Sequence, residues 1–120
     1  MAIEPDTKDW TWVLERRCPE CGFDAPSVSF DDVPGLIRDN AAAWPAILAR
    51  PDSRDRPRVD RWSPLEYACH VRDVFRLFDM RLHRMLDEDD PTFANWDQDE
   101  TAVAERYSEQ DAVTVGRDLV

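Results

Sequence analysis

The sequence predicts an all-α protein with two long amphipathic helices, part of a further helix and an irregular N-terminal extension. Nine prolines and only three glycines among 120 residues suit a helical protein better than a turn-rich β protein. In two long segments, apolar residues recur at three- and four-residue steps, which is the helical period. The second of these segments also opens with a helix-capping sequence.

The chain divides by composition into an extension, residues 1–30, and a helical part, residues 31–120. Its total length fits one domain. The extension contains turn-forming residues and the tryptophans Trp10 and Trp12 but shows no helical period, so we expect irregular structure there. It also contains a CxxC motif.

The first helix is expected to begin near Asp31 or Asp32, since either carboxylate can accept hydrogen bonds from the free backbone N–H groups of a first turn. Pro34 fits that turn, where a missing donor costs nothing. Pro45 lies within the helical pattern, and because an interior proline destabilises a helix by about 3 kcal/mol, we expect a kink or a late break there. The helical face comprises Leu36, Ile37, Asn40, Trp44, Ile47 and Leu48.

The second helix is expected to begin at Ser63, after a charged, proline-containing linker over residues 51–61. Ser63 as the cap, Pro64 at the first helical position and Glu66 three residues after the cap form a capping box. An acidic run over residues 87–90 ends the helix. Its apolar stripe, which is expected to face a core, comprises Tyr67, Val71, Val74, Phe75, Phe78, Leu82, Met85 and Leu86.

The last thirty residues predict a loop over residues 91–99, a short helical turn over residues 100–106 and a further helix. Ser108 can cap that helix. Its apolar positions are Val113, Val115, Leu119 and Val120. Two and a half amphipathic helices leave apolar stripes that need a partner surface.

The net charge of −11 opposes binding to nucleic acid and to anionic membranes, because like charges repel. A small molecule or a protein is the favoured partner. The first ten residues are mostly polar, and no apolar segment of a secretion signal follows them. The longest apolar stretch, residues 41–49, is too short to cross a bilayer. We therefore expect a cytoplasmic protein without nucleic-acid or membrane partners.

His70 is the first candidate for a functional residue. At about 100° per residue, it lies roughly 40° outside the apolar stripe of the second helix. A histidine at the rim of a bundle helix can direct a neutral imidazole nitrogen at a metal ion, or it can be a hydrogen-bonded boundary residue. His83 lies far along the same helix on its polar side, so it cannot share a metal with His70.

Acidic residues near His70 admit two interpretations. Glu66 and Asp73 lie one turn to either side of it and can orient or tune its imidazole. The capping box also explains Glu66, and solvation or a pair with Arg76 also explains Asp73. The acidic group within residues 97–100 suggests acid–base chemistry, but in a chain with 26 acidic residues a charge run is usually solvated.

Cys18 and Cys21 are candidate metal ligands, because a two-residue spacer lets both thiolates reach one tetrahedral zinc ion. A structural zinc needs two more ligands, which another residue or a second chain would supply. Free structural thiols and redox chemistry are the alternatives, although a redox pair usually opens a helix after a strand. Cys69 is isolated, and its direction on the helix differs from that of His70 by about 100°, so a joint site is unfavourable.

The segment Trp62–Asp73 resembles the start of the second helix in DinB-like and YfiT-like proteins, a family of proposed metalloenzymes that includes mycothiol-dependent isomerases. The shared pattern is a tryptophan, a capping serine (Ser63), a glutamate (Glu66) and then His70. The resemblance implies an up-down four-helix bundle. Its divalent metal, zinc or nickel, would be held by one histidine on the second helix and two on the last. Several members act as thiol-dependent transferases or isomerases, so a small-molecule thiol is the implied partner.

Residues 10–22 and 93–101 also resemble an actinobacterial branch of this family. Of the family's three metal histidines, only His70 is carried over, because the last helix has no counterpart in a sequence that ends at Val120. We therefore expect a C-terminally truncated, incomplete bundle that binds metal weakly and is inactive alone, since catalytic ions usually have three protein ligands. The alternative is a non-enzymatic interaction module that completes its bundle by self-association into a homo-oligomer.

Overall fold

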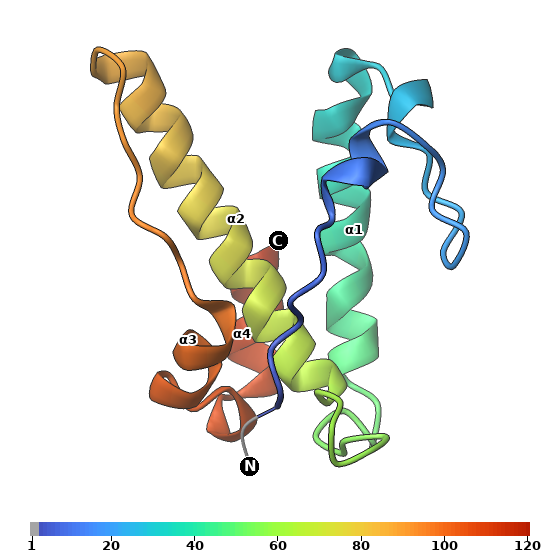
Figure 1. Ribbon diagram of the computed structural model, residues 1–120. Helices are drawn as coiled ribbons and strands as arrows, with labels where there is room; N and C mark the ends of the chain where they lie inside the picture. The colour runs from blue at the N-terminus through green and yellow to red at the C-terminus, as the bar shows by residue number, and fades with distance from the viewer. Residues whose placement is uncertain (1–2) are drawn as a thin grey trace.

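The computed structural model describes residues 3–120, and all regular structure in this range is helical (Figure 1). This confirms the prediction of an all-α protein. None of the helices in this range has the length and apolarity needed to cross a bilayer. The α-helices are α1 (Val33–Leu48), α2 (Pro64–Asp87), α3 (Gln98–Ala104) and α4 (Ala112–Leu119). The 3-10 helices are η1 (Thr11–Leu14), η2 (Ala25–Ser27), η3 (Phe30–Asp32) and η4 (Tyr107–Glu109).

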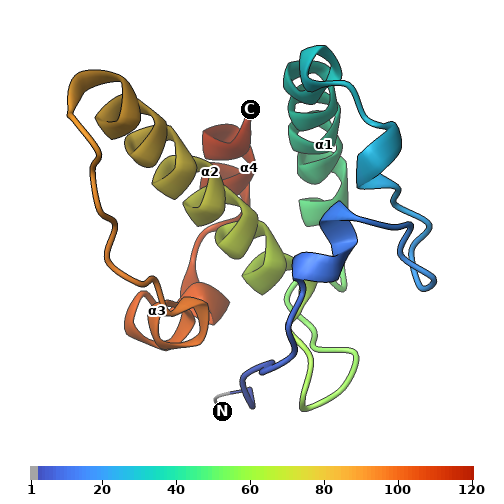
Figure 2. The same ribbon diagram turned by 45° about the horizontal axis from the view of Figure 1, so that its top comes forward.

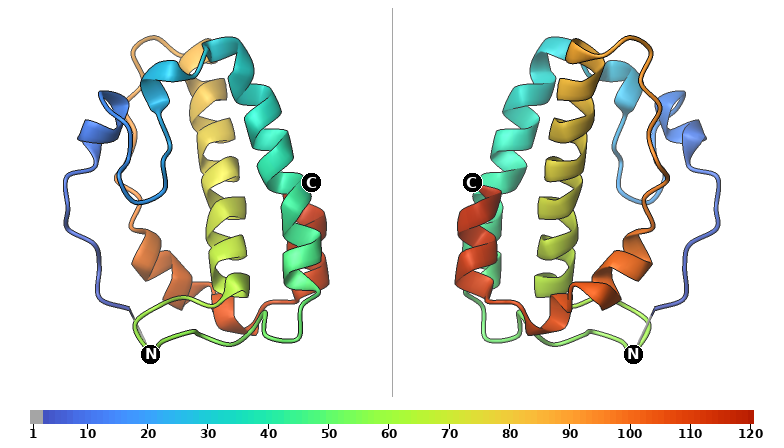
Figure 3. Two further views of the ribbon diagram at one scale, coloured as in Figure 1. Left: turned by 90° about the vertical axis from the view of Figure 1, so that its right-hand side faces the viewer. Right: turned by 90° about the vertical axis from the view of Figure 1, so that its left-hand side faces the viewer.

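The two long helices form a V. The loop over residues 49–63 joins α1 to α2 at the narrow end, and the helices diverge toward the other end (Figure 1 and Figure 2). α4 packs against both of them, and α3 packs against α2. The side views in Figure 3 place the segment from residue 3 to η1 on one side of the α1–α2 pair and α4 on the other.

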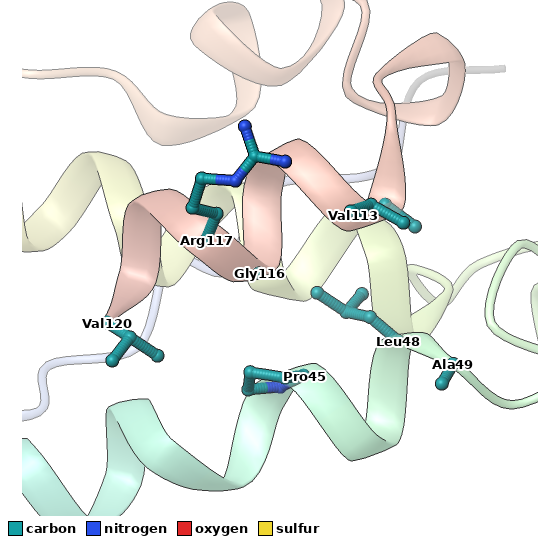
Figure 4. A pocket seen from close by; sticks show the side chains of 8 residues that line it. Pro45, Leu48, Ala49, Val113, Gly116, Arg117 and Val120 are labelled. Carbon is teal, nitrogen blue, oxygen red and sulfur yellow. The ribbon is translucent and has the colours of Figure 1, made fainter.

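The core lies at the narrow end of the V, where α1, α2, η4 and α4 meet. Its buried members are Leu48, Leu65, Ala68, Cys69, Tyr107, Val115 and Leu119. α4 packs against α1 at Gly116, where a Cβ atom would lie 3.4 Å from Cδ1 of Leu48, an ordinary packing distance. A cavity of about 450 Å³ remains between the two helices, lined by apolar side chains such as Pro45 and Val113 (Figure 4).

The prediction that the whole apolar stripe of α2 faces a core is wrong. Its second half is exposed, with 57% of Phe78, 50% of Leu82 and 74% of Leu86 accessible to solvent. The residues of α2 that are buried all lie between Leu65 and Arg72, in its first half. The reason is geometric, because α4 covers only the narrow end and α1 diverges from α2 beyond it (Figure 1).

Helix starts and interruptions differ from the prediction in three places. α1 is preceded by a capping box in which Ser29 and Asp32 exchange hydrogen bonds one turn earlier, so Asp32 does not cap α1 itself. α1 continues through Pro45 to Leu48, so the helix does not break at the proline, and the expected alternative, a kink, stays a prediction. Asp111 caps α4, whereas Ser108 lies within η4, because the aspartate stands directly before the helix.

The predicted capping box of α2 is confirmed. The hydroxyl oxygen of Ser63 accepts the backbone N–H of Glu66 at 3.2 Å, and Oε1 of Glu66 accepts the backbone N–H of Ser63 at 3.1 Å. Arg56 then donates to both carboxylate oxygens of Glu66, from Nε at 2.8 Å and from Nη2 at 2.7 Å. Burial would raise the pKa of Glu66, but the hydrogen bonds from Arg56 and Ser63 outweigh it and lower the pKa.

We expect the substitution Glu66→Ala to destabilise the protein by about 3 kcal/mol, because it removes one partner of a buried ion pair and the helix cap together. Urea unfolding followed by circular dichroism measures the free energy of unfolding. The matched control is Glu88→Ala, since Glu88 pairs with Arg84 in an exposed position and should contribute below about 1 kcal/mol.

The same carboxylate gives this prediction a pH dependence. Because the pKa of Glu66 is lowered from 4.5, its contribution is complete above pH 4.5 and is lost as the pH falls further. The stability difference between the native protein and the Glu66→Ala variant should therefore shrink in acid. Equal losses for Glu66→Ala and Glu88→Ala near neutral pH would contradict this role of Glu66.

Candidate functional site

His70 lies in the second turn of α2, one turn after Glu66, with its ring between two tryptophans. The ring centroid is 5.2 Å from that of Trp62, which directly precedes the helix cap. On the other side Trp96, from the loop before α3, stacks nearly parallel to the imidazole at 5.8 Å. Trp62 is buried, and His70 and Trp96 are half-buried. Two indoles therefore hold the ring in one orientation.

The Nδ1 atom of His70 is buried and has no hydrogen-bond partner in residues 3–120. Burial lowers the pKa of His70, and the carboxylates of Asp73 and Asp99 oppose this shift without cancelling it. The imidazole is therefore neutral at physiological pH. A neutral imidazole has one nitrogen with a free lone pair, which can accept a hydrogen bond or bind a metal ion.

Two cavities meet at His70. A polar cavity of about 390 Å³ lies on one side, and Asp60, Asp99 and Ile3 contribute to its wall. An open apolar groove of about 450 Å³ lies between α1 and α2, and Phe23 of the N-terminal extension contributes to it. Residues 3–30 therefore line both spaces next to the histidine.

Asp73 does not orient the imidazole. Its carboxylate accepts hydrogen bonds from the hydroxyl of Tyr107 and from Nε of Arg72, the latter at 2.9 Å. The predicted pair with Arg76 is present at 3.9 Å as a weaker contact. Burial raises the pKa of Tyr107, so the phenol stays protonated and remains a donor. This network connects α2 to η4 and serves packing.

Asp99 is the site residue that sequence reasoning assigned to a solvated charge run. It is half-buried at the polar cavity, where burial and the neighbouring Asp97 raise its pKa and His70 lowers it. Asp97 itself caps α3 by accepting the backbone N–H groups of Asp99 and Glu100. The sequence signal for Asp99 was its position three residues after Trp96. Because the indole of Trp96 stacks on His70, Asp99 lies close to the same histidine.

Within residues 3–120, no group of three or more metal-binding side chains occurs. The two cysteines of the extension therefore do not form a common metal site with His70 and Cys69. Cys18 is buried and Cys21 is exposed. Backbone N–H groups of Cys21 and Glu20 lower the pKa of the Cys18 thiol. Cys69 is fully buried, and burial raises its pKa to about 11, so it remains an unreactive thiol in the core.

His83 is exposed, in agreement with the prediction. Its Nδ1 lies 2.8 Å from the backbone carbonyl oxygen of Asp79, and this contact raises the pKa of His83. The described site thus offers one neutral imidazole, a nearby carboxylate and an apolar groove. That arrangement can contact one side of a bound small molecule or supply one coordinating atom to a metal ion. Within residues 3–120 it does not contain three coordinating side chains for an ion.

The two histidines are expected to titrate in opposite directions from the usual value of 6.5, His70 below it and His83 above it. As the pH falls, His83 should be protonated first, because His70 must take up its proton in a buried site. Histidine-selective NMR titration measures both pKa values, and His83→Gln assigns the signals. Because the pKa of His70 is lowered on folding, its contribution to stability should be present above pH 6.5 and decline below it. Protonation of His70 before His83 would contradict its burial between the tryptophans.

Comparison with known proteins leaves the family of this chain open. No family model, no curated protein and no solved structure matches it.

Proposed function

We propose that this chain is a DinB-like helical protein in which His70 is one ligand of a divalent metal used in thiol-dependent transfer or isomerisation. The observation that carries the proposal is the buried Nδ1 atom of His70, which lacks a partner among the described residues. Leaving a buried polar atom unsatisfied costs about 1–3 kcal/mol. Native proteins usually satisfy such an atom with an ion, a ligand or an ordered water.

The resemblance points to the same residue independently of the geometry. In the DinB-like proteins that the segment Trp62–Asp73 resembles, the histidine of the second helix is a metal ligand. Zinc or nickel suits an imidazole nitrogen. A small-molecule thiol is the proposed co-substrate on the same resemblance.

The residues described do not form a complete metal site. His70 is a suitable donor, but a catalytic ion usually requires three protein ligands, and residues 3–120 contain no group of three. The donors that would accompany His70 must therefore come from outside this range. We expect residues 3–120 alone to bind metal weakly and to be inactive as an enzyme.

Nickel titration tests the role of His70. The starting protein carries Cys18→Ser and Cys21→Ser, so that thiols do not compete for the ion. We expect paramagnetic broadening of the imidazole signals of His70 and the indole signals of Trp62 and Trp96, with a Kd on the order of 1 mM, or about −4 kcal/mol. His70→Ala should abolish it, and His83→Ala should leave it unchanged.

Two results of the nickel titration would count against the proposal. Broadening of the tryptophan signals that persists in His70→Ala would show that the histidine is not a ligand. Stoichiometric binding at micromolar concentration by a monomer, lost in His70→Ala, would show that the chain already has a complete site.

A second function is favoured by the exposed apolar surface of the V. Leu36 and Ile37 of α1, together with Phe78 and Leu82 of α2, are each about half exposed. The open groove between the two helices runs from His70 past Leu36 and Ile37. Large exposed apolar patches usually mark interaction surfaces. The alternative function is therefore an interaction module in which a second copy covers the α1–α2 groove.

Sedimentation velocity in the presence of EDTA tests the interaction module. We expect the native protein to self-associate, and we expect Leu82→Glu to weaken the association at least about tenfold, equal to 1.4 kcal/mol, because it places a charge in an apolar interface. Val59→Glu is the control, since Val59 is an exposed apolar residue of the linker. A monodisperse monomer that unfolds cooperatively would exclude the need for a second copy.

A further inference from the structure

The loop from Cys18 to Gly22 is folded around the sulfur of its first cysteine. The backbone N–H of Gly22 donates to the carbonyl oxygen of Cys18 at 2.9 Å, and the backbone N–H of Cys18 donates to the carbonyl oxygen of Phe23 at 2.8 Å. Gly22 has a φ of 78°, in the left-handed region that glycine adopts without strain. These contacts make a closed turn with both cysteines on it.

The turn also brings hydrogen-bond donors to the sulfur of Cys18. The backbone N–H groups of Glu20 and Cys21, and to a lesser extent the thiol of Cys21, lower the pKa of the Cys18 thiol. Hydrogen bonds from backbone N–H groups stabilise the negative charge of a thiolate, which is the form that binds metal. Both cysteines lie on the same closed backbone turn, and a two-residue spacer lets two thiolates reach one tetrahedral ion. The backbone of the turn is therefore suited to metal binding.

We propose that Cys18 and Cys21 are half of a tetrahedral zinc site, and that the same two cysteines of a second copy complete it. Tetrahedral sites built from thiolates are typical of structural zinc. Within residues 3–120 this pair has no third ligand, and Cys69 is fully buried in the core at the narrow end of the V. A two-fold axis through the ion would let two identical loops contribute equally.

The position of the loop permits this arrangement. In Figure 1 and Figure 2 the blue segment between η1 and η2 extends outward at the edge of the molecule, beside α1 and away from α2 and α4. Two copies can therefore meet loop to loop without contact between their long helices. Cys21 is already on the exposed side of the turn.

The charges around the loop are mixed, because Glu15, Glu20 and Asp24 carry negative charges beside two arginines. Zinc with four thiolates has a net charge of −2, and Arg16 and Arg17 directly precede Cys18 in each copy. Arg17 pairs with Asp24 at 3.9 Å, at the base of the loop, which holds its guanidinium near the turn. These arginines offset part of the repulsion between two acidic chains.

A cobalt titration of the full, reduced, metal-free chain tests the proposal, because Co²⁺ reports thiolate coordination by its absorption. We expect a sulfur-to-cobalt charge-transfer band and the d–d bands of a tetrahedral ion. They should saturate at one ion per two chains and disappear when Zn²⁺ displaces the cobalt. Sedimentation velocity of the Leu82→Glu variant, in which association through the α1–α2 surface is weakened, should show that the mass doubles with metal compared with EDTA.

The variants separate this site from the one at His70. Cys21→Ser should abolish the bands and the metal-dependent mass change while leaving the helix content unaltered, since Cys21 is exposed. Cys69→Ser and His70→Ala should leave both readouts unchanged, so that a failure of the metal proposal for His70 does not affect this test. Absence of a charge-transfer band, or saturation at one ion per chain without a change in mass, would overturn the proposal.

Discussion

The position of the candidate site depends on the carboxylate of Glu66. This side chain caps the start of α2, accepts two hydrogen bonds from Arg56 and is almost completely buried. A buried carboxylate is stable only when its oxygens are paired, so the linker must fold back to supply the arginine. The linker also accepts a backbone hydrogen bond from the helix, since the N–H of Leu65 donates to the carbonyl oxygen of Ser53. With the start of α2 held in this way, Trp62 and His70 lie in fixed positions on either side of the same helical turn.

At His70 three features support the proposal that this histidine is a metal ligand. Burial keeps the imidazole neutral, two indoles prevent its rotation, and Nδ1 has no partner in residues 3–120. The exposed groove beside His70 is relevant both to the metal hypothesis and to the interaction hypothesis. A further helix or a second copy that covered the α1–α2 groove would also enclose His70, so the metal and interaction hypotheses concern the same surface and differ in what covers it.

Local signals in the sequence predicted much of the fold and less of the site. The capping box at Ser63 and the end of α2 were predictable because they depend on residues close together in the chain. The exposure of Phe78 and Leu82 was not, since periodicity shows which face of a helix is apolar but not how far a neighbouring helix covers it. The contact between Asp73 and Tyr107 joins residues far apart in sequence, and no pattern around either residue indicates it. The position of His70 at the rim of the helix was predicted correctly. The stacking of Trp96 on its ring could not be predicted, because it depends on the path of the loop before α3.

We propose that His70 is a metal ligand without companion donors within residues 3–120. The most direct measurement is an anomalous difference map from crystals of the Cys18→Ser, Cys21→Ser variant soaked in nickel. We expect a peak within bonding distance of a ring nitrogen of His70, with water molecules as the other ligands. An ion at His70 coordinated by two further side chains of the same chain would contradict this proposal, as would nickel bound elsewhere with His70 unligated.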